Sequence, residues 1–316
     1  MSETQSCLII GSGWMAQEYL KAAKFLPQDK FSVYAPSERN KEAITKLNGK
    51  FYTDLNLALT EAKPTHVIVA SSVESLVEVS KKVLELKINN VLIEKPAYLH
   101  RPEGEDLLKR AGGKNVLVGY NRRFYASANK PLEMIKANDE KFVGVQFEFT
   151  ELATDVTGTD KFSTETKEHW AHANSSHVID FAFFPVGLPQ ENRWQAYKVG
   201  SLTWHPSAAQ MVGSGLTEKG IPFSYSAYWG GVGRWSTEWI TDKTRYIFRP
   251  MEKLQVQRLG TFSYQEIDLE WKYEGAKHGL VEQLKGFLHG EGSGKFLTLQ
   301  QSLKLNKAIS EIAGYK

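Results

Sequence analysis

A chain of 316 residues exceeds the size that one hydrophobic core usually supports, so the sequence predicts two domains. Its composition, with 41% hydrophobic and 24% charged residues, is that of an ordinary globular protein. A net charge of +3 without a dense Lys/Arg stripe argues against nucleic acid as a partner. No apolar stretch approaches the roughly 20 residues of a membrane span, which argues against a membrane partner.

Cysteine content and the N-terminus indicate the compartment. The sequence contains one cysteine, Cys7, so no disulfide can form within the chain, and its apolar neighbours predict a small buried side chain. The first five residues lack the basic and apolar regions of a signal peptide. We therefore expect a cytoplasmic protein.

A glycine-rich turn follows the first apolar run, residues 7–10. It reads G-x-G-x-x-A between a predicted strand and a predicted helix that places Met15 and Tyr19 on one face. The first glycine of such a turn permits a tight bend, the second lets the backbone approach a pyrophosphate, and the small last residue allows close packing of helix on strand. The helix N-terminus would receive the phosphates. This context predicts dinucleotide binding by Gly11, Ser12, Gly13, Trp14 and Met15.

The end of the second predicted strand, residues 31–35, indicates which dinucleotide is bound. NAD-selective sites usually have an acid there to bond the ribose 2′-hydroxyl, but this position is Ala35. Ser37, Arg39 and Asn40 instead offer groups suited to a 2′-phosphate, so the sequence favours NADP, with NAD still possible. The alternative is that Ser37 only caps a helix beginning near Glu38 and that Arg39 is a solvated helix residue.

Strand and helix patterns then alternate as far as residue 119. Strands are predicted at 66–70, 90–93 and 115–119, and helices at 55–62, at 73–86 and ending at 107–112. Right-handed crossovers between them give a parallel, doubly wound α/β sheet. Ser71 and Ser72 follow one of these strands, in the loop that would face the nicotinamide side of a bound cofactor.

The strand at 90–93 ends on Glu94-Lys95-Pro96. Proline cannot continue a ladder, so Lys95 would stand at the carboxyl end of the strand, where ligands bind in open α/β sheets. Taken alone, these three residues are more simply interpreted as a solvated charged turn.

Four motifs in this order resemble those of the Gfo/Idh/MocA oxidoreductases: the glycine-rich turn, Glu94-Lys95-Pro96, the segment 118–124, and Ser176-His177-Val178-Ile179-Asp180. The closing helical patterns at 278–288 and 297–312 are similar to the family as well. The resemblance implies an N-terminal Rossmann domain and a C-terminal α+β domain on an open, mostly antiparallel sheet. It also implies hydride transfer between NAD(P) and a hydroxyl or carbonyl carbon of a sugar or sugar derivative.

We expect residues 1–121 to form the dinucleotide-binding domain and residues 122–316 the substrate and oligomerisation domain, leaving open whether the C-terminal helices pack back on the first. Seven of the eight tryptophans lie at or beyond Trp170, which indicates two domains of different character. The second half predicts a strand at 142–151, a polar loop over the site at 155–167, a helix at 168–184, strands between 194 and 269, and a turn at 230–233. Trp229, Trp235 and Trp239 could line an oligomer interface or stack on a sugar, but core packing is the simplest interpretation.

The resemblance implies catalytic roles for two residues. Lys95 would lie near nicotinamide and substrate, beside the cofactor contact Glu94, and would stabilise charge on the reacting oxygen. His177 would act as acid and base, although a helical histidine is otherwise more simply a core residue. The Asp that the family commonly has four residues earlier is Ala173 here. Asn174 shares the His177 face and can position substrate, but it cannot act as a carboxylate.

Other residues are candidates for positioning the substrate. Tyr120, Arg123 and Asp180 are candidates for positioning, and His172 adds a second imidazole. The arginines Arg122, Arg123 and Arg234 would suit a phosphorylated or nucleotide-linked sugar, or only form surface pairs.

We expect no metal, because the spacing of His169, His172 and His177 does not bring them to one point. The expected partners are a sugar or nucleotide-sugar substrate and further copies of the chain, bound through the C-terminal sheet. The alternative is a regulatory protein of the same fold that binds the dinucleotide without turnover.

Overall fold

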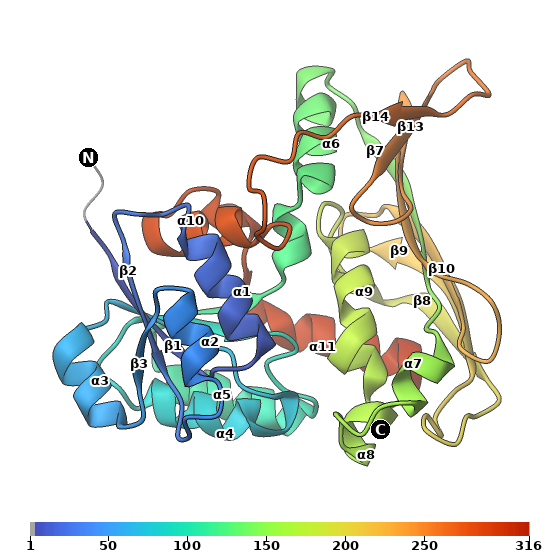
Figure 1. Cartoon of the computed structure of the whole chain (residues 1–316). Coiled ribbons are helices and arrows are strands. Elements are labelled where there is room, and N and C mark those ends of the chain that lie inside the picture. Colours follow the sequence, from blue (N-terminus) through green and yellow to red (C-terminus); the bar gives the residue numbers. More distant parts are fainter. Residues whose placement is uncertain (1–3, 316) are drawn as a thin grey trace. The chain divides into compact units, whose positions relative to one another are not determined.

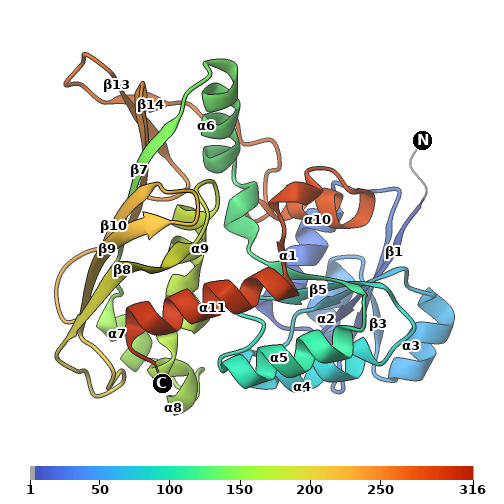
Figure 2. The same cartoon turned by 180° about the vertical axis from the view of Figure 1, so that it is seen from behind.

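Residues 4–315 are described by the computed structural model, and the chain divides into two compact units (Figures 1 and 2). Unit 1 comprises the residues up to Phe124 together with Trp271–Leu303. Unit 2 comprises Tyr125–Glu270 together with the residues from Lys304 onward. The chain therefore leaves unit 1, forms most of unit 2, returns to unit 1 and ends in unit 2.

Unit 1 is built on a sheet with the spatial order β3-β2-β1-β4-β5-β6-β15. Neighbouring strands are parallel except β15, which pairs antiparallel with β6. The strands are β1 (Ser6–Ile10), β2 (Lys30–Tyr34), β3 (Lys50–Tyr52), β4 (His66–Val69), β5 (Asn90–Glu94), β6 (Asn115–Gly119) and β15 (Leu297–Thr298). The central strands are apolar and buried along their length, as a parallel sheet covered on both faces requires. The predicted doubly wound sheet is confirmed; β3 and β15 were not predicted.

Helices cover both faces of this sheet. Figure 1 shows α1 and α10 on one side and α4 and α5 on the other. The helical segments of unit 1 are α1 (Trp14–Ala23), α2 (Lys41–Lys46), α3 (Leu55–Ala62), α4 (Val73–Leu84), α5 (Arg101–Ala111), α10 (Leu280–His289) and the short η1 (Asn121–Phe124) and η3 (Ser293–Lys295). Tyr19 and Leu20 of α1 share one buried cluster with Leu280, Val281 and Leu284 of α10. One side of the sheet is therefore completed by residues far beyond the rest of the unit in sequence.

Unit 2 contains an open sheet with the order β14-β13-β12-β11-β7-β10-β9-β8. Its pairs are antiparallel except β7 with β10, so the predicted mostly antiparallel sheet is confirmed. The strands are β7 (Phe142–Phe149), β8 (Pro189–Val199), β9 (Gln210–Thr217), β10 (Pro222–Tyr228), β11 (Trp235–Thr241), β12 (Thr244–Phe248), β13 (Leu254–Arg258) and β14 (Gln265–Ile267).

The helical segments of unit 2 are α6 (Ala126–Ala137), α7 (Ala153–Thr157), α8 (Thr164–Glu168), the π-helical segment η2 (Ala171–Ser175) and α9 (Ser176–Phe183), while α11 (Leu299–Ala313) begins in unit 1 and continues into unit 2. The prediction of a loop at 155–167 was wrong in part, because the segment contains the end of α7 and the start of α8. Ser163 caps α8 by accepting a hydrogen bond from the backbone N–H of Thr166, which explains a helix in so polar a stretch.

The core of unit 2 is aromatic. Phe181 of α9 stacks on Trp239 of β11, with ring centroids 4.9 Å apart and an interplanar angle of 20°. Trp229 and Trp239 are 1% and 0% exposed, so the core interpretation holds for both, whereas Trp235 is half-buried. Among the helices of residues 4–315, none is both long and apolar enough to cross a membrane.

Candidate functional site

The glycine turn lies at the carboxyl end of β1 in unit 1. Gly11 has φ +112°, and a Cβ there would lie 2.5 Å from the carbonyl oxygen of Ala70, so only glycine fits between β1 and β4. At Gly13 an added Cβ would meet no described atom within 4 Å, which leaves room for a ligand against the backbone. Within α1, no side chain caps the N-terminus and no acid stands in the first turn. The turn therefore fits the pyrophosphate of a dinucleotide.

The segment after β2 lies beside this turn. Asn40 donates from Nδ2 to Ser12 Oγ over 3.3 Å and stands at the N-cap of α2, which begins at Lys41 rather than near Glu38. The interpretation of Ser37 as the helix cap is therefore wrong. Ser37 and Arg39 are exposed in the bend before the helix.

Ser71 and Ser72 follow β4 at the same edge of the sheet. An added Cβ at Gly11 would lie 3.0 Å from the backbone nitrogen of Ser71, so this serine is next to the glycine turn. Ser71 Oγ is buried, and no described residue forms a hydrogen bond with it. Ser72 precedes α4, where its Oγ lies 3.1 Å from that of Ser75. A hydroxyl without a protein partner at this edge is suited to a bound ligand.

Glu94 is the last residue of β5, and its carboxylate points into unit 1. Tyr19 donates its hydroxyl hydrogen to Glu94 Oε1 over 2.5 Å, and its hydroxyl oxygen lies 3.1 Å from Gln283 Oε1 of α10. Burial raises the pKa of Glu94, while the hydrogen bond from Tyr19 and the charges of Lys277 and Lys95 act to lower it. At Gly119 of β6 an added Cβ would lie only 3.0 Å from Glu94 Oε1, so the carboxylate fits because this position is small.

Lys95 follows Glu94 and is only partly buried. Unit 1 thus brings the glycine turn, Asn40, Ser71 and Lys95 to the carboxyl ends of its strands. The predicted contacts of these residues with a cofactor remain predictions.

Asn174 and His177 lie in unit 2, on η2 and α9. Asn174 donates from Nδ2 to both carboxylate oxygens of Glu151, over 3.2 and 3.1 Å, and the neighbouring Ser175 donates from Oγ to Glu151 Oε1 over 2.5 Å. Both residues belong to the π-helical segment η2, so two adjacent side chains of this segment bind one carboxylate. His177 is 6% exposed, and its ring centroid lies 6.5 Å from that of Trp235.

Glu151 was not predicted. It follows β7, is 7% exposed, and burial raises its pKa although hydrogen bonds, first that from Ser175, act to lower it. The indole of Trp235 also acts to lower the pKa of Glu151, so Glu151 and His177 share a neighbour. Ala173 is small and apolar, but unit 2 supplies a carboxylate beside the next residue.

Other candidates have structural contacts. His172 bonds to Ser310 Oγ over 3.0 Å and to Asn306 over 3.3 Å, so this second imidazole faces α11. Arg123 of unit 1 donates to the carbonyl oxygen of Lys295 over 3.1 Å. Arg122 and Tyr120 also lie in unit 1, whereas Asp180, which is buried, and Arg234, which is exposed, lie in unit 2. No cluster of metal-ligating side chains occurs among residues 4–315.

A parallel sheet in this strand order, with an uncapped glycine turn at its carboxyl edge, defines a Rossmann protein that binds a dinucleotide. Residues 5–122 match the GFO_IDH_MocA model, described as "Oxidoreductase family, NAD-binding Rossmann fold". Residues 5–122 are therefore similar to this family of NAD-binding oxidoreductases.

Solved structures resemble the chain along nearly its whole length. A Gfo/Idh/MocA family oxidoreductase from Vibrio cholerae is 17% identical with a TM-score of 0.75, over 99% of this chain and 96% of that one. Levoglucosan dehydrogenase in complex with NADH is 14% identical with a TM-score of 0.76, over 99% of this chain and 97% of that one. At these identities the likeness shows the shared fold.

A curated relative matches over a shorter stretch. UvrABC system protein C from Oenococcus oeni is 26% identical over 198 residues, which are 62% of this chain and 28% of that protein. The chain therefore spans less than a third of the length of this relative.

Proposed function

We propose that the protein is an NAD(P)-dependent dehydrogenase or reductase that acts on a hydroxyl or carbonyl carbon of a sugar or sugar derivative. The observation that carries the proposal is the uncapped glycine turn after β1, at the same edge of the sheet as the end of β5, where Glu94 is followed by Lys95; β4 lies between the two strands. Levoglucosan dehydrogenase, which shares the fold, supports a sugar as the substrate class.

We assign one role in hydride transfer to Lys95 and another to His177. A bound dinucleotide supplies or accepts the hydride. Lys95, partly exposed after β5, would donate a hydrogen bond to the reacting oxygen and stabilise negative charge on it. His177 would take the hydroxyl proton during oxidation and return it during reduction.

Asn174 would position the substrate, and Glu151 would orient Asn174. Because its amide nitrogen is bonded to both oxygens of Glu151, the amide oxygen of Asn174 points away from that carboxylate. An oxygen held this way can accept a hydrogen bond from a substrate hydroxyl. Glu151 is thus a positioning residue in the proposal.

We propose NADP as the preferred cofactor, with NAD as the weaker one. Arg39 is exposed in the bend before α2, Asn40 lies against the glycine turn, and the end of β2 is followed by Ala35 in place of an acid. Exposed guanidinium and amide groups suit a 2′-phosphate better than a 2′-hydroxyl.

We also propose that the chain forms a homo-oligomer through the open sheet of unit 2. Tyr197 of β8 and Val212 of β9 are directly paired and both exposed, and Val199 and Tyr228 flank Gln210 in the next row. Cross-strand partners share one face of a sheet, so these side chains form a contiguous apolar patch, defined here as the β8–β10 patch.

The test of the function is nicotinamide absorbance with NADP⁺ and NAD⁺ against levoglucosan, free hexoses, inositols and UDP-linked sugars. We expect turnover of at least one sugar, with the higher kcat/KM for NADP⁺. Tight binding of either dinucleotide without turnover of any sugar, ketose reduction included, would favour the second candidate.

That second candidate is a regulatory protein that binds the dinucleotide without turnover. Ala173, in the place where the family commonly has an acid, favours it. The carboxylate of Glu151 beside Asn174 and the presence of Lys95 favour the enzyme.

A further inference from the structure

Tyr315 follows α11, whose end lies beside α8 (Figures 1 and 2). The tyrosine hydroxyl accepts a hydrogen bond over 3.0 Å from the backbone N–H of Ala171, the first residue of η2. Its ring centroid lies 4.8 Å from that of His169 and 5.2 Å from that of His172. Tyr315 therefore packs against the start of the segment that carries Asn174.

His205 fixes the direction of the hydrogen bonds at the Tyr315 hydroxyl. The Nδ1 atom of His205 lies 2.6 Å from the carbonyl oxygen of Ala208, which can only accept, so Nδ1 carries the hydrogen. Burial lowers the pKa of His205 to about 4, so the ring is neutral near pH 7 and its Nε2 accepts. Tyr315, whose hydroxyl lies 2.9 Å away, therefore donates to Nε2 while it accepts from Ala171.

Contacts from the end of α11 and from Tyr315 hold the start of η2. The first N–H groups of a helical segment have no carbonyl acceptor within it, so Ala171 needs a partner from elsewhere, which Tyr315 provides. The next residue, His172, bonds through Nε2 to Ser310 Oγ of α11 over 3.0 Å. The first two residues of η2 are thus bonded to one neighbouring stretch of unit 2.

The other end of η2 is bonded to Glu151. Asn174 and Ser175 both donate to this carboxylate, and Asn174 stands about one helical turn beyond Ala171. Over so short a segment, a shift of the backbone at Ala171 would also move the amide of Asn174. The contact that holds Ala171 therefore helps to determine where that amide points.

We propose that Tyr315 is a positioning residue for the substrate site of unit 2. Its hydroxyl fixes the backbone at the start of η2, and so it fixes the direction in which the amide oxygen of Asn174 meets a substrate hydroxyl. The proposal rests on the proposed function, in which Asn174 positions the sugar. Tyr315 acts through Asn174 and not on the substrate itself.

The test is steady-state kinetics of the full-length protein at saturating NADP⁺. The substrate is whichever of levoglucosan, the free hexoses, the inositols and the UDP-linked sugars is turned over fastest. Tyr315→Phe keeps the ring and removes the hydroxyl, and it is made both in the wild type and in an Asn174→Ala background. Tyr225→Phe on β10 is the matched control, because its hydroxyl is also buried but forms no hydrogen bond with a described residue.

For Y315F we expect KM for the sugar to rise about fivefold, with kcat and the Kd of NADPH within about twofold of the wild type. Y225F should leave all three values within about twofold. In the N174A background, Y315F should change KM by less than about twofold, because two residues that act through one contact are not additive. A merely structural effect of Y315F would be the same in both backgrounds.

Hydrogen–deuterium exchange gives a second readout that needs no substrate. The amides of residues 171–175 should exchange at least about threefold faster in Y315F than in the wild type or in Y225F, because the N–H of Ala171 has lost its acceptor. If Y315F does not fold, His205→Gln, which removes the ring nitrogen that accepts from Tyr315, replaces it in the same measurements.

Any of four results would overturn the proposal: unchanged KM in Y315F, an equal rise in Y225F, an equal rise in the N174A background, or unchanged exchange of residues 171–175. Failure of the proposed function is distinguishable. A wild type that turns over none of the sugars would overturn the proposed function and this role together, whereas turnover with the same KM in the wild type and in Y315F would overturn this role alone.

Discussion

Lys95 and Glu94 are neighbours in sequence but differ in their surroundings. Glu94 is 6% exposed and bonded to Tyr19, whereas Lys95 is partly exposed at the edge of the sheet. Glu94 therefore helps to fix the end of β5, and Lys95 is the member of the pair that remains accessible to a ligand.

The first prediction concerns Lys95→Met. If Lys95 stabilises charge on the reacting oxygen, we expect kcat/KM to fall by about 100-fold or more, because a positioned acid or charge contributes on that order. The Kd of NADPH should change by less than about threefold. The control is Lys24→Met, at the C-cap of α1, which should leave both values unchanged. Full turnover in K95M would contradict the role.

The second prediction concerns Glu151→Gln. A glutamine offers one acceptor and one donor, so the two-oxygen contact with Asn174 is lost and its amide is no longer fixed. We expect KM for the sugar to rise about tenfold, corresponding to roughly one charged hydrogen bond, with kcat and NADPH affinity little changed. Glu148→Gln, on β7 itself, is the control. An equal fall of kcat with constant KM would argue against positioning.

Some residues of the candidate site could be predicted from the sequence and others could not, and the difference has a physical cause. Gly11 and Gly13 could be predicted because a glycine turn between strand and helix is local. Glu151 could not, because it stands in no motif and meets Asn174 and Ser175 only after the chain has formed α7 and α8.

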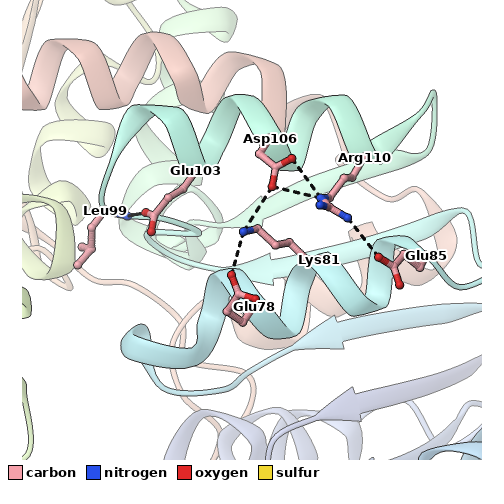
Figure 3. A network of polar contacts seen from close by, with 7 residues as sticks. All are labelled: Glu78, Lys81, Glu85, Leu99, Glu103, Asp106 and Arg110. Carbon is pink, nitrogen blue, oxygen red and sulfur yellow. Dashed lines mark hydrogen bonds and ion pairs between the residues drawn. The ribbon is translucent and has the colours of Figure 1, made fainter.

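At the scale of elements, α4 and α5 lie side by side and are joined by ion pairs (Figure 3). Asp106 of α5 accepts from Arg110 Nε over 3.1 Å and lies 3.4 Å from Lys81 Nζ of α4, while Lys81 also pairs with Glu78. Arg110 in turn contacts Glu85, just beyond α4, over 3.2 Å. Asp106 therefore connects the two helices.

The third prediction is the effect of Asp106→Asn on stability. The side chains are 26–69% exposed, so solvent screens the network, and we expect a loss below about 1 kcal/mol. The loss should shrink further in high salt, measured by urea denaturation. Glu105→Gln, which removes only the pair within α5 with Arg101, should cost less. A loss that salt leaves unchanged would contradict an electrostatic origin.

The helices and strands of the structure show which elements the sequence patterns could predict. The long strands and amphipathic helices of unit 1 were predicted within a few residues. The π-helical turn at Ala171–Ser175 was not, because its sequence differs little from that of an α-helix. The two-residue β15 has too little sequence for any pattern.

At the scale of the whole molecule, buried histidines set the response to acid. His205 is fully buried, with Nδ1 2.6 Å from the carbonyl oxygen of Ala208 and Nε2 2.9 Å from the Tyr315 hydroxyl. Burial lowers its pKa to about 4, against the bond to Ala208, and burial also lowers the pKa of His66.

The fourth prediction follows from the sign of these shifts. Because the folded-state pKa of His205 lies below its unfolded value near 6.5, the unfolded chain binds the proton more readily. Stability is therefore full above pH 6.5 and falls as the pH drops towards 4, by roughly 2–3 kcal/mol from this residue. Melting curves across that range should show a smaller decline for His205→Gln. An identical decline would argue against His205 as the source.

The fifth prediction tests the β8–β10 patch. Val212→Glu places a charge beside Tyr197 on the exposed face of the sheet. A charge buried in an apolar interface is strongly unfavourable, so we expect the variant to sediment as a monomer where the wild type sediments as an oligomer. Ser214→Glu, two residues along β9, tests how far the interface extends. A monomeric wild type would contradict the proposed homo-oligomer.

The division of unit 1 between two stretches of chain has a consequence for synthesis on the ribosome. When residues up to Glu270 have been made, the strands from β1 to β6 are complete, but α10 is missing and the apolar side of α1 around Tyr19 and Leu20 lacks its cover. Domains usually fold in order as they emerge, yet this one has to wait while all the strands of unit 2 are translated. The nascent chain would thus carry an unfinished nucleotide-binding domain through most of its synthesis, and would become able to bind a dinucleotide only when the last tenth or so of the chain is made.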